Sequence, residues 1–173
     1  YEAGSYITVL GAKEAATADS ISVTGMEAKK FLKIQAHLIS DDANTGSSTG
    51  STGINTRIRV NGDSGSNYAR RMDGEGAGYT NEGTSVNQDH LHIVDEDEFD
   101  RFTVIHVVNQ DNQEKIFMAQ TVAAASNGTA VPSLVEAVGK WANTSNQITS
   151  IEFYNTGSGS MVEGSEVVVY GTD

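Results

Sequence analysis

The feature that most constrains the fold is the last part of the chain, where two apolar runs flank a cluster of glycine, serine and asparagine. Residues 148–154 place Ile151 and Phe153 between polar neighbours, and residues 165–170 contain three consecutive valines. These β-branched and aromatic residues favour strands, because they fit a pleated and half-buried surface. The small and polar residues between the runs are typical of a loop. We therefore predict that the two runs form a β-hairpin with a long loop.

Similar short runs recur along the rest of the chain. In residues 31–39 the even-numbered side chains are apolar and predict a core-facing surface, while Lys33 and Gln35 belong to the other face. We also predict that residues 67–72 return beside residues 56–60 as a hairpin, because turn-forming residues separate them. Further strands are expected at residues 20–24, 86–94, 102–108, 116–122 and 134–141.

These runs and the turns between them predict the fold class. No segment carries a helix signal of typical length, and the spacing of strands and turns is that of a sandwich or barrel. We predict an all-β protein with an antiparallel, jelly-roll-like β-sandwich of about 8–10 strands. Residues 1–18 are expected to form an N-terminal arm, and residues 19–173 a single domain.

Charge and composition narrow the classes of partner. The chain has 23 acidic and 11 basic side chains, and its formal net charge is -12. A field of this sign repels phosphate backbones and anionic membranes, so we expect neither nucleic acid nor a membrane as partner. Because the chain has no cysteine, disulfides, thiolate metal sites and cysteine nucleophiles are excluded.

One motif is similar to the nucleophile segment of trypsin-like serine proteases. Residues 62–65 are Gly-Asp-Ser-Gly, and Ser64 would need His37 as general base and Asp41 to orient that histidine. A protease of this type needs two barrels and a longer chain, and a tight turn explains the same residues. We therefore predict no enzyme and no catalytic residue. A hydrolase is the alternative from a different functional class.

Two groups of side chains are candidates for holding a metal ion. His90 and His92 are two residues apart, so on a strand both rings project from one face, as in a zinc or nickel site. Asp95 and Asp97 belong to an acidic run that offers oxygen ligands to Ca²⁺, but its spacing lacks the EF-hand pattern. Because neither group is a complete ligand set, we assign no metal and no cofactor.

Glycan sites on β-sandwiches usually use aromatic platforms. The candidate rings are Trp141, Tyr68, Tyr79 and Tyr154, which are scattered along the chain. Buried aromatic rings also fill cores and subunit interfaces. Glycan binding is therefore an alternative function and not the first expectation.

Three segments, in order, resemble a recurrent β-sandwich domain of tailed-phage virion structural proteins. They are residues 56–68 (TRIRVNGDSGSNY), residues 140–145 (KWANTS), and residues 148–154 (ITSIEFY) followed by residues 162–171 (VEGSEVVVYG). In such proteins the first run forms a strand and turn, and the last forms the closing strand. The resemblance covers most of the chain after Phe31, and it is loose between Arg71 and Gly139.

The resemblance implies a structural role in a virion. Similar domains occur as capsid decoration, or cement, proteins and in head-fibre or tail proteins. We expect a homotrimeric decoration protein on the outer capsid surface, which binds the outer face of the major capsid protein shell and stabilises it. The alternative is a tail or fibre module that binds a receptor or host glycan. The candidate interface residues are Tyr1, Tyr6, Ile7, Phe31, Ile39 and Phe99.

Overall fold

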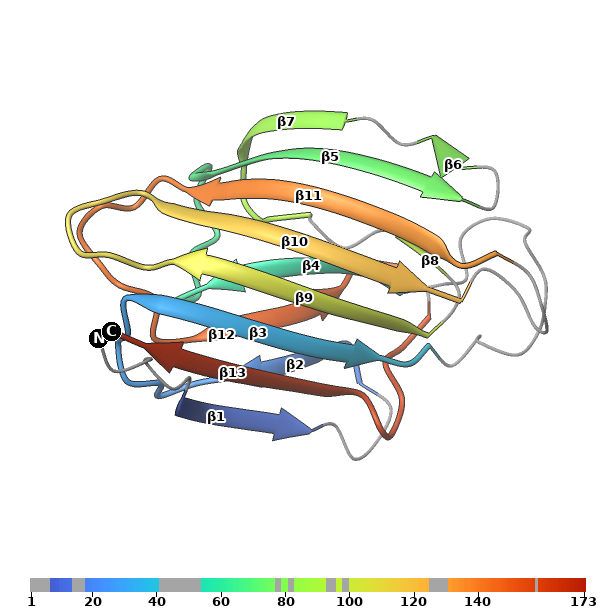
Figure 1. The fold of residues 1–173 in the computed structure, drawn as a ribbon, viewed down its shortest axis with the longest axis horizontal. Coiled ribbons are helices and arrows are strands. Elements are labelled where there is room, and N and C mark those ends of the chain that lie inside the picture. The colour runs from blue at the N-terminus through green and yellow to red at the C-terminus, as the bar shows by residue number, and fades with distance from the viewer. Residues whose placement is uncertain are drawn as a thin grey trace, which may run out of the picture.

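A computed structural model describes residues 7–13, 18–40, 54–76, 79–80, 83–92, 96–97, 100–124, 131–157 and 159–173. This part of the chain contains strands β1 to β13 and no helix, so it includes no helix able to span a membrane. The strands form two antiparallel sheets that pack face to face (Figure 1). The predicted all-β, antiparallel sandwich is therefore confirmed.

The larger sheet has nine strands and forms the front layer in Figure 1. Its order is β1-β13-β3-β9-β10-β11-β5-β6, and β7 pairs with β5. Its strands are β1 (Ile7–Lys13), β3 (Phe31–Leu38), β5 (Tyr68–Gly76), β6 (Tyr79–Thr80), β7 (Gly83–Gln88), β9 (Arg101–Val108), β10 (Lys115–Ala123), β11 (Ser133–Trp141) and β13 (Glu166–Thr172).

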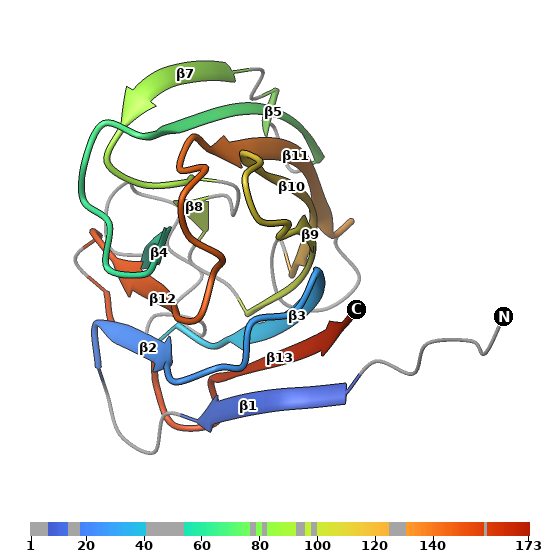
Figure 2. The same ribbon diagram turned by 90° about the vertical axis from the view of Figure 1, so that its left-hand side faces the viewer.

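The smaller sheet has four strands in the order β2-β12-β4-β8. The strands are β2 (Ser20–Val23), β4 (Ile54–Val60), β8 (Glu96–Asp97) and β12 (Ile151–Asn155). Seen from the side, the larger sheet curves around the smaller one, with β1 and β7 at its two ends (Figure 2). Each sheet therefore has one surface against the core and one surface facing outward.

The core fills the space between the sheets and is built by alternation along the strands. In β3 the even-numbered side chains from Leu32 to Leu38 are buried, which confirms the core face predicted for residues 31–39. Ile58 of β4 and Phe153 of β12 meet the core from the smaller sheet and are fully buried. The strands expected at residues 102–108, 116–122 and 134–141 are present as β9, β10 and β11.

A buried asparagine joins the end of β9 to two distant backbone segments. The side-chain amide of Asn109 donates to the carbonyl oxygens of Lys29 at 2.9 Å and Ile148 at 3.3 Å. Its Oδ1 accepts a hydrogen bond from the backbone N–H of Ile148 at 2.6 Å. Since buried backbone groups need partners, this one side chain satisfies polar groups that no strand pairs.

The predicted hairpin at residues 148–171 is wrong, because its two runs lie in different sheets. β12 pairs with β2 and β4 in the smaller sheet, whereas β13 pairs with β1 and β3 in the larger one. Phe153 therefore meets the core from one sheet, and Val167 and Val169 meet it from the other. Alternation shows which side chains face inward, but it does not show which sheet a strand joins.

The predicted pairing of residues 56–60 with residues 67–72 is wrong for the same reason. β4 lies in the smaller sheet and β5 in the larger one, so residues 61–67 cross between the sheets. Asn61 and Gly62 have positive φ angles of 51° and 66°, which suit the conformations that Asn and Gly adopt in turns. The dense turn chemistry predicted at this point is present, but it builds a crossover.

Part of the expected N-terminal arm belongs to the sandwich. β1 pairs with β13, with Ile7 opposite Gly171 and Lys13 opposite Glu166. β13 therefore has a paired strand on each side, β1 on one and β3 on the other. This placement secures the closing strand of the chain within the larger sheet.

Candidate docking surface

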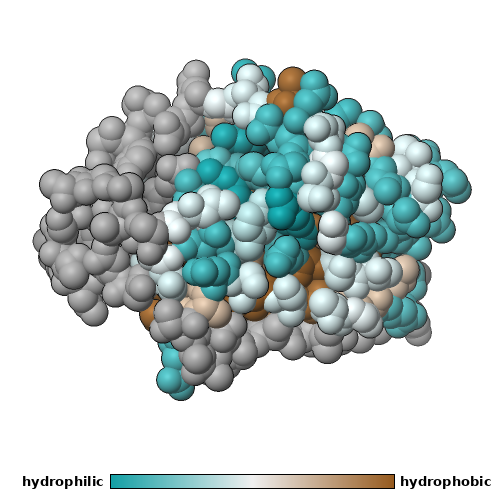
Figure 3. All heavy atoms as spheres, turned by 180° about the vertical axis from the view of Figure 1, so that it is seen from behind, coloured by the Kyte–Doolittle hydropathy of each residue, from teal (hydrophilic) through white to brown (hydrophobic). Residues whose placement is uncertain are grey.

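The outer surface of the larger sheet exposes large apolar side chains on three neighbouring strands. On β9, β10 and β11, six such side chains are between 44 and 57 % exposed. They are Phe102, Ile116, Met118, Val122, Leu134 and Val138. The opposite surface of the molecule, seen in Figure 3, is mostly hydrophilic where it is described. Because contiguous exposed apolar patches mark interaction sites, we call the outer surface of β3, β9, β10, β11 and β5 the docking face.

Covering these side chains favours association, but the free energy gained does not by itself give a stable complex. Complete burial of one such side chain is worth about 2 kcal/mol, so covering the exposed half of six gives on the order of 6 kcal/mol. Association itself costs about 4–15 kcal/mol in lost freedom of motion. A stable complex at this surface therefore also needs polar side chains that match those of the partner.

An acidic row crosses the docking face perpendicular to the strands. Glu136 of β11 lies opposite Asp73 of β5 on one side and Gln120 of β10 on the other. The amide of Gln120 donates to Glu136 Oε1 at 2.9 Å. Two carboxylates and an amide held in register thus lie between two groups of the apolar side chains, with Phe102, Val122 and Leu134 on one side and Ile116, Met118 and Val138 on the other.

A second row, two residues further along each strand, carries basic and apolar side chains. Val138 lies between Arg71 of β5 and Met118 of β10, and the row continues to His106 of β9 and Lys33 of β3. The register therefore places a partly basic row directly beside the acidic one. The two rows are one strand repeat apart, about 7 Å.

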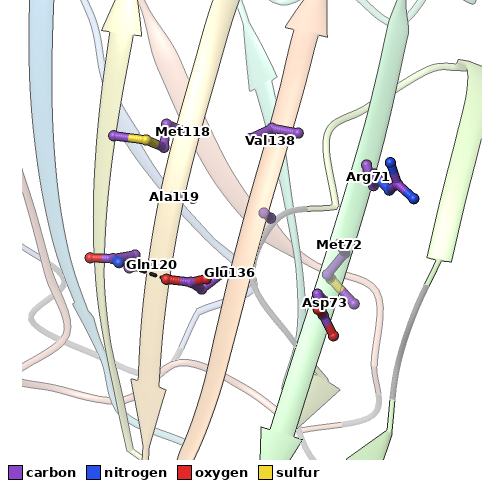
Figure 4. Close-up of a pocket in the computed structure, with 9 residues that line it drawn as sticks. Arg71, Met72, Asp73, Met118, Ala119, Gln120, Glu136 and Val138 are labelled. Carbon is purple, nitrogen blue, oxygen red and sulfur yellow. Dashed lines mark hydrogen bonds between the residues drawn. The ribbon is translucent and has the colours of Figure 1, made fainter.

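A hollow of about 340 Å³ lies over these two rows on β10, β11 and β5 (Figure 4). Met118 and Val138 provide apolar walls, while Asp73, Glu136 and Arg71 provide charge. The hollow can receive a flexible side chain from a partner, with its apolar part inside and its polar end at the border. Such mixed sites give both contact area and orientation.

The docking face is close to neutral, unlike the chain as a whole. On this face its strands carry three described cations and two described carboxylates, and the Lys140 ammonium lies 2.9 Å from Glu114, so these charges sum to 3 − 3 = 0, against -12 for the whole chain. The residues on this face of the strands are Lys33, Arg71, Lys140, Asp73 and Glu136. Since like charges repel, another acidic protein meets less repulsion at this surface than the net charge of the chain implies.

Of the six predicted interface residues, the structure describes the side chains of Phe31 and Ile39. Phe31 begins β3 on the docking face, opposite Val108, and the Lys30 ammonium lies 5.6 Å from its ring centre. Ile39 follows the other end of β3, roughly 25 Å away for a strand of this length, and its N–H donates to Ser165 Oγ at 3.0 Å. Of these two, Phe31 lies on the docking face and Ile39 lies beyond the end of its strand.

The side chains of the other four predicted interface residues lie outside the described part of the chain. Ile7 belongs to β1, but its side chain is not among those described. Tyr1, Tyr6 and Phe99 lie outside the described residues.

The candidate metal-binding histidines lie beside arginines. The strand expected at residues 86–94 is shorter, and after β7 the chain bends at Asp89 and His90. Leu91 then exchanges two backbone hydrogen bonds with β4, each 2.9 Å long. Asp89 is 2.6 Å from His90 Nδ1 and 2.5 Å from the guanidinium of Arg59. Its carboxylate is therefore already shared by two neighbours.

The second histidine is in a positive environment that disfavours a cation. His92 is 8 % exposed, and among the described residues its Nε2 has no hydrogen-bond partner. Burial and, to a smaller extent, the charges of Arg57, Arg70 and Arg101 together lower the pKa of His92 to about 3. Within the described ranges, no three His, Asp or Glu side chains are grouped to hold a metal ion. Asp95 lies outside those ranges, and the side chain of Asp97 is not described.

The Gly-Asp-Ser-Gly motif has a structural role. Asp63 accepts hydrogen bonds from the indole N–H of Trp141 at 2.7 Å, the N–H of Gly65 at 2.8 Å and the amide of Asn67 at 2.9 Å. The hydroxyl of Tyr68 donates to the Asp63 carbonyl oxygen at 2.9 Å. Burial raises the pKa of Asp63, but the three hydrogen bonds outweigh it and hold the pKa below its usual value.

The protease hypothesis fails on geometry in the described residues. His37 lies opposite Phe102, at the start of β9. Ser64 belongs to the turn held by Trp141, at the end of β11 and the opposite end of the larger sheet. Asp41, the expected orienting carboxylate, lies outside the described residues. His37 and Ser64 are therefore not brought together.

The aromatic candidates for a glycan platform are mostly enclosed. Tyr68 and Trp141 are each 1 % exposed. Tyr154 is half-buried, and the guanidinium of Arg59 lies 4.5 Å from its ring centre. Tyr79 is in β6, with its side chain not described. Among the described rings, none of these candidates offers an open face for stacking on a sugar.

The sequence contains a signal for the docking face in β10, outside its recognisable motifs. β10 carries Ile116, Met118 and Val122 on its outer face as well as Phe117 and Ala119 on its inner face. An antiparallel strand with one face in water normally alternates apolar and polar side chains. Apolar residues on both faces therefore indicated that the outer face meets a partner.

Comparison with known proteins yields no match to a family model, to a curated protein or to a solved structure. The function therefore has to be argued from the docking face and from the resemblance carried by the sequence motifs.

Proposed function

We propose that the protein is a non-enzymatic virion structural protein of the capsid-decoration type. In this role it binds the outer face of the shell formed by the major capsid protein and stabilises that shell. The proposal combines the resemblance of the sequence to phage sandwich domains with a surface built for association. The exposed apolar side chains of the docking face make association the function that the geometry supports best.

The observation that carries the proposal is the docking face. Six exposed apolar side chains lie on neighbouring strands of one sheet, next to ordered charged rows. A chain that acted alone in water would gain solubility from polar residues there. The face is therefore expected to be covered in the working assembly of the protein.

The charge of the chain favours the outside of the shell. At -12, the protein is repelled by the phosphate backbone of a packaged genome. An acidic protein on the outer surface avoids this repulsion. The lack of cysteine also makes assembly independent of the redox state of the compartment.

Binding to shells tests the proposal. Purified protein is mixed with capsid shells assembled without it, the shells are sedimented, and the bound protein is counted per capsid subunit. We expect saturable binding at a fixed ratio and a higher temperature of shell disruption. No binding, or binding without a fixed ratio, would contradict a decoration role.

A tail or fibre module that binds host glycan is the second candidate in the virion. The enclosed rings of Tyr68 and Trp141 argue against them as its contact residues. A glycan array separates the two functions, because a decoration protein is expected to bind none of the sugars. Specific glycan binding together with absence from shells would favour the fibre function.

A further inference from the structure

We propose that the docking face pairs with the docking face of a second copy of the chain. The two copies are related by a twofold axis that lies across the strands, between the acidic row and the partly basic row. This inference rests on the proposed function, because both take the docking face as a surface at which the protein assembles. It goes further in two ways. It names a second copy of the chain as the partner that covers the face, and it gives the orientation of the two copies.

The orientation follows from where the charges lie. A twofold axis across the strands places each strand opposite its own copy, reversed in direction, so each row faces the neighbouring row. Asp73 of one copy then faces Arg71 of the other, and Arg71 faces Asp73. In the same way Gln35 faces Lys33. In a dimer, the acidic row of each copy therefore faces the partly basic row of the other copy.

An axis parallel to the strands gives the opposite result. It would place the acidic row against itself, with Glu136 and Asp73 approaching the same carboxylates of the other copy. Like charges at close distance suppress binding. The charge pattern therefore selects one of the two simple twofold arrangements in which these faces can meet.

The apolar side chains follow the same symmetry. Phe102 and Val122 occupy the row beyond the acidic one, while Val108 and Ile116 occupy the row beyond the basic one. The proposed axis brings these two rows together on both sides of the centre. At the centre, Met118 of each copy meets the hollow of the other, and methionine fills irregular spaces well.

Net charge does not oppose contact between two copies at this face. Two molecules of charge -12 repel each other, but the described charges of the docking face and of Glu114, which pairs with Lys140, cancel. The repulsion between the molecules is therefore weaker at this face than their net charge alone implies. The hydrophilic surface over the smaller sheet then points away from the contact on both sides (Figure 3).

The pairing gives the decoration role a physical basis. A twofold pair carries two identical copies of every remaining surface, so it can bind two neighbouring capsid subunits at once. Binding at two linked sites strengthens attachment without new contacts. The pair also differs from the trimer expected from the sequence, and a mass measurement distinguishes them.

The first experiment measures the mass of the full chain by sedimentation over a range of concentrations. We expect a reversible equilibrium between one and two chains. Val138 faces Glu136 of the other copy, so Val138→Glu adds repulsion, and the matched variant Val138→Lys adds attraction. Val138→Glu is expected to raise the dissociation constant about 30-fold, and Val138→Lys much less. Thr24→Glu, an exposed position after β2, is the control and should leave the pair unchanged.

The second experiment tests the facing pair of Arg71 and Asp73. Arg71→Asp alone and Asp73→Arg alone should each weaken the pair about tenfold. The double variant exchanges the two charges, so it should restore most of the affinity. Circular dichroism and melting temperature confirm that each variant is folded. A double variant no tighter than the singles would overturn the proposed orientation.

The outcomes separate this inference from the proposed function. A single chain or three chains at all concentrations, or a pair that Val138→Glu leaves intact, overturns the inference. Failure of a normal pair to bind shells overturns the decoration role and leaves the pairing standing. Shell binding by a wild-type protein that is monomeric throughout supports the role and rejects the pairing.

Discussion

The indole N–H of Trp141 donates a hydrogen bond to Asp63 Oδ2 at 2.7 Å, across 78 residues of chain. This bond ties the end of β11 in the larger sheet to the crossover that connects β4 with β5. The bond therefore holds the crossover between the two sheets against the end of the larger sheet.

Removing the carboxylate of Asp63 should destabilise the fold. Asp63→Ala leaves the buried indole N–H of Trp141 without an acceptor, and we expect the free energy of unfolding to fall by about 2–3 kcal/mol. Because the pKa of Asp63 is lowered in the folded state, its contribution is present above pH of about 4 and is lost as pH falls through the folded pKa. Urea denaturation from pH 2 to pH 7 measures both effects. Glu163→Ala, at an exposed turn, is the control and should have little effect.

Protonation of the buried His92 should make the fold sensitive to acid. This effect should begin at a higher pH than the effect of protonating the carboxylates of the protein. Burial lowers the pKa of His92 to about 3, so below pH of about 6.5 the unfolded chain binds the proton more readily than the folded one. Stability should therefore decline by a few kcal/mol as pH falls from 6.5 towards 3. In His92→Gln this slope should flatten between pH 4 and pH 6.5. The exposed His37→Gln is the control, and an unchanged slope in His92→Gln would refute the explanation.

Asn109 should be a stability determinant although it is polar. Asn109→Ala removes the 2.6 Å bond to the N–H of Ile148 and leaves the Lys29 carbonyl without this donor. We expect a loss of about 3 kcal/mol, since these groups are buried. Asn146→Ala, exposed in the same connection, should lose less than 1 kcal/mol. Equal losses in a denaturant titration would contradict the role given to Asn109.

Gly164 should tolerate alanine less well than Gly25. Both have positive φ angles, 98° and 68°, which disfavour a side chain. A Cβ at Gly164 would also lie 3.0 Å from Ile39 Cδ1, whereas nothing lies within 4 Å at Gly25. Gly164→Ala should therefore cost about 1 kcal/mol more than Gly25→Ala in thermal or chemical unfolding. Similar costs would show that the contact with Ile39 relaxes freely.

Local alternation predicted the strands well because it reports which side chains face the core. The inward residues of β3 and the existence of β9, β10 and β11 follow directly from it. The same signal failed for β12 and β13, since Phe153 and Val169 point inward whichever sheet their strands join. Strand partners depend on contacts far apart in the sequence, and spacing along the chain does not encode them.

The candidate site was predicted less well than the fold. The motifs offered His37, Ser64 and the histidine pair as candidates to which no site was assigned, and the structure uses the Gly-Asp-Ser-Gly turn to hold Trp141. The docking face depends on the register of neighbouring strands, which places Arg71 beside Val138 and Asp73 beside Glu136. That register becomes visible only when the strand order is known.

The central claim, that this chain is a decoration protein on the outside of a capsid shell, is tested most directly by an image of the intact particle. We predict density for the β-sandwich on the outer face of the shell, in contact with the major capsid protein and present in a fixed ratio to it. Density for the sandwich only at the tail or fibres, or inside the shell, would contradict the account.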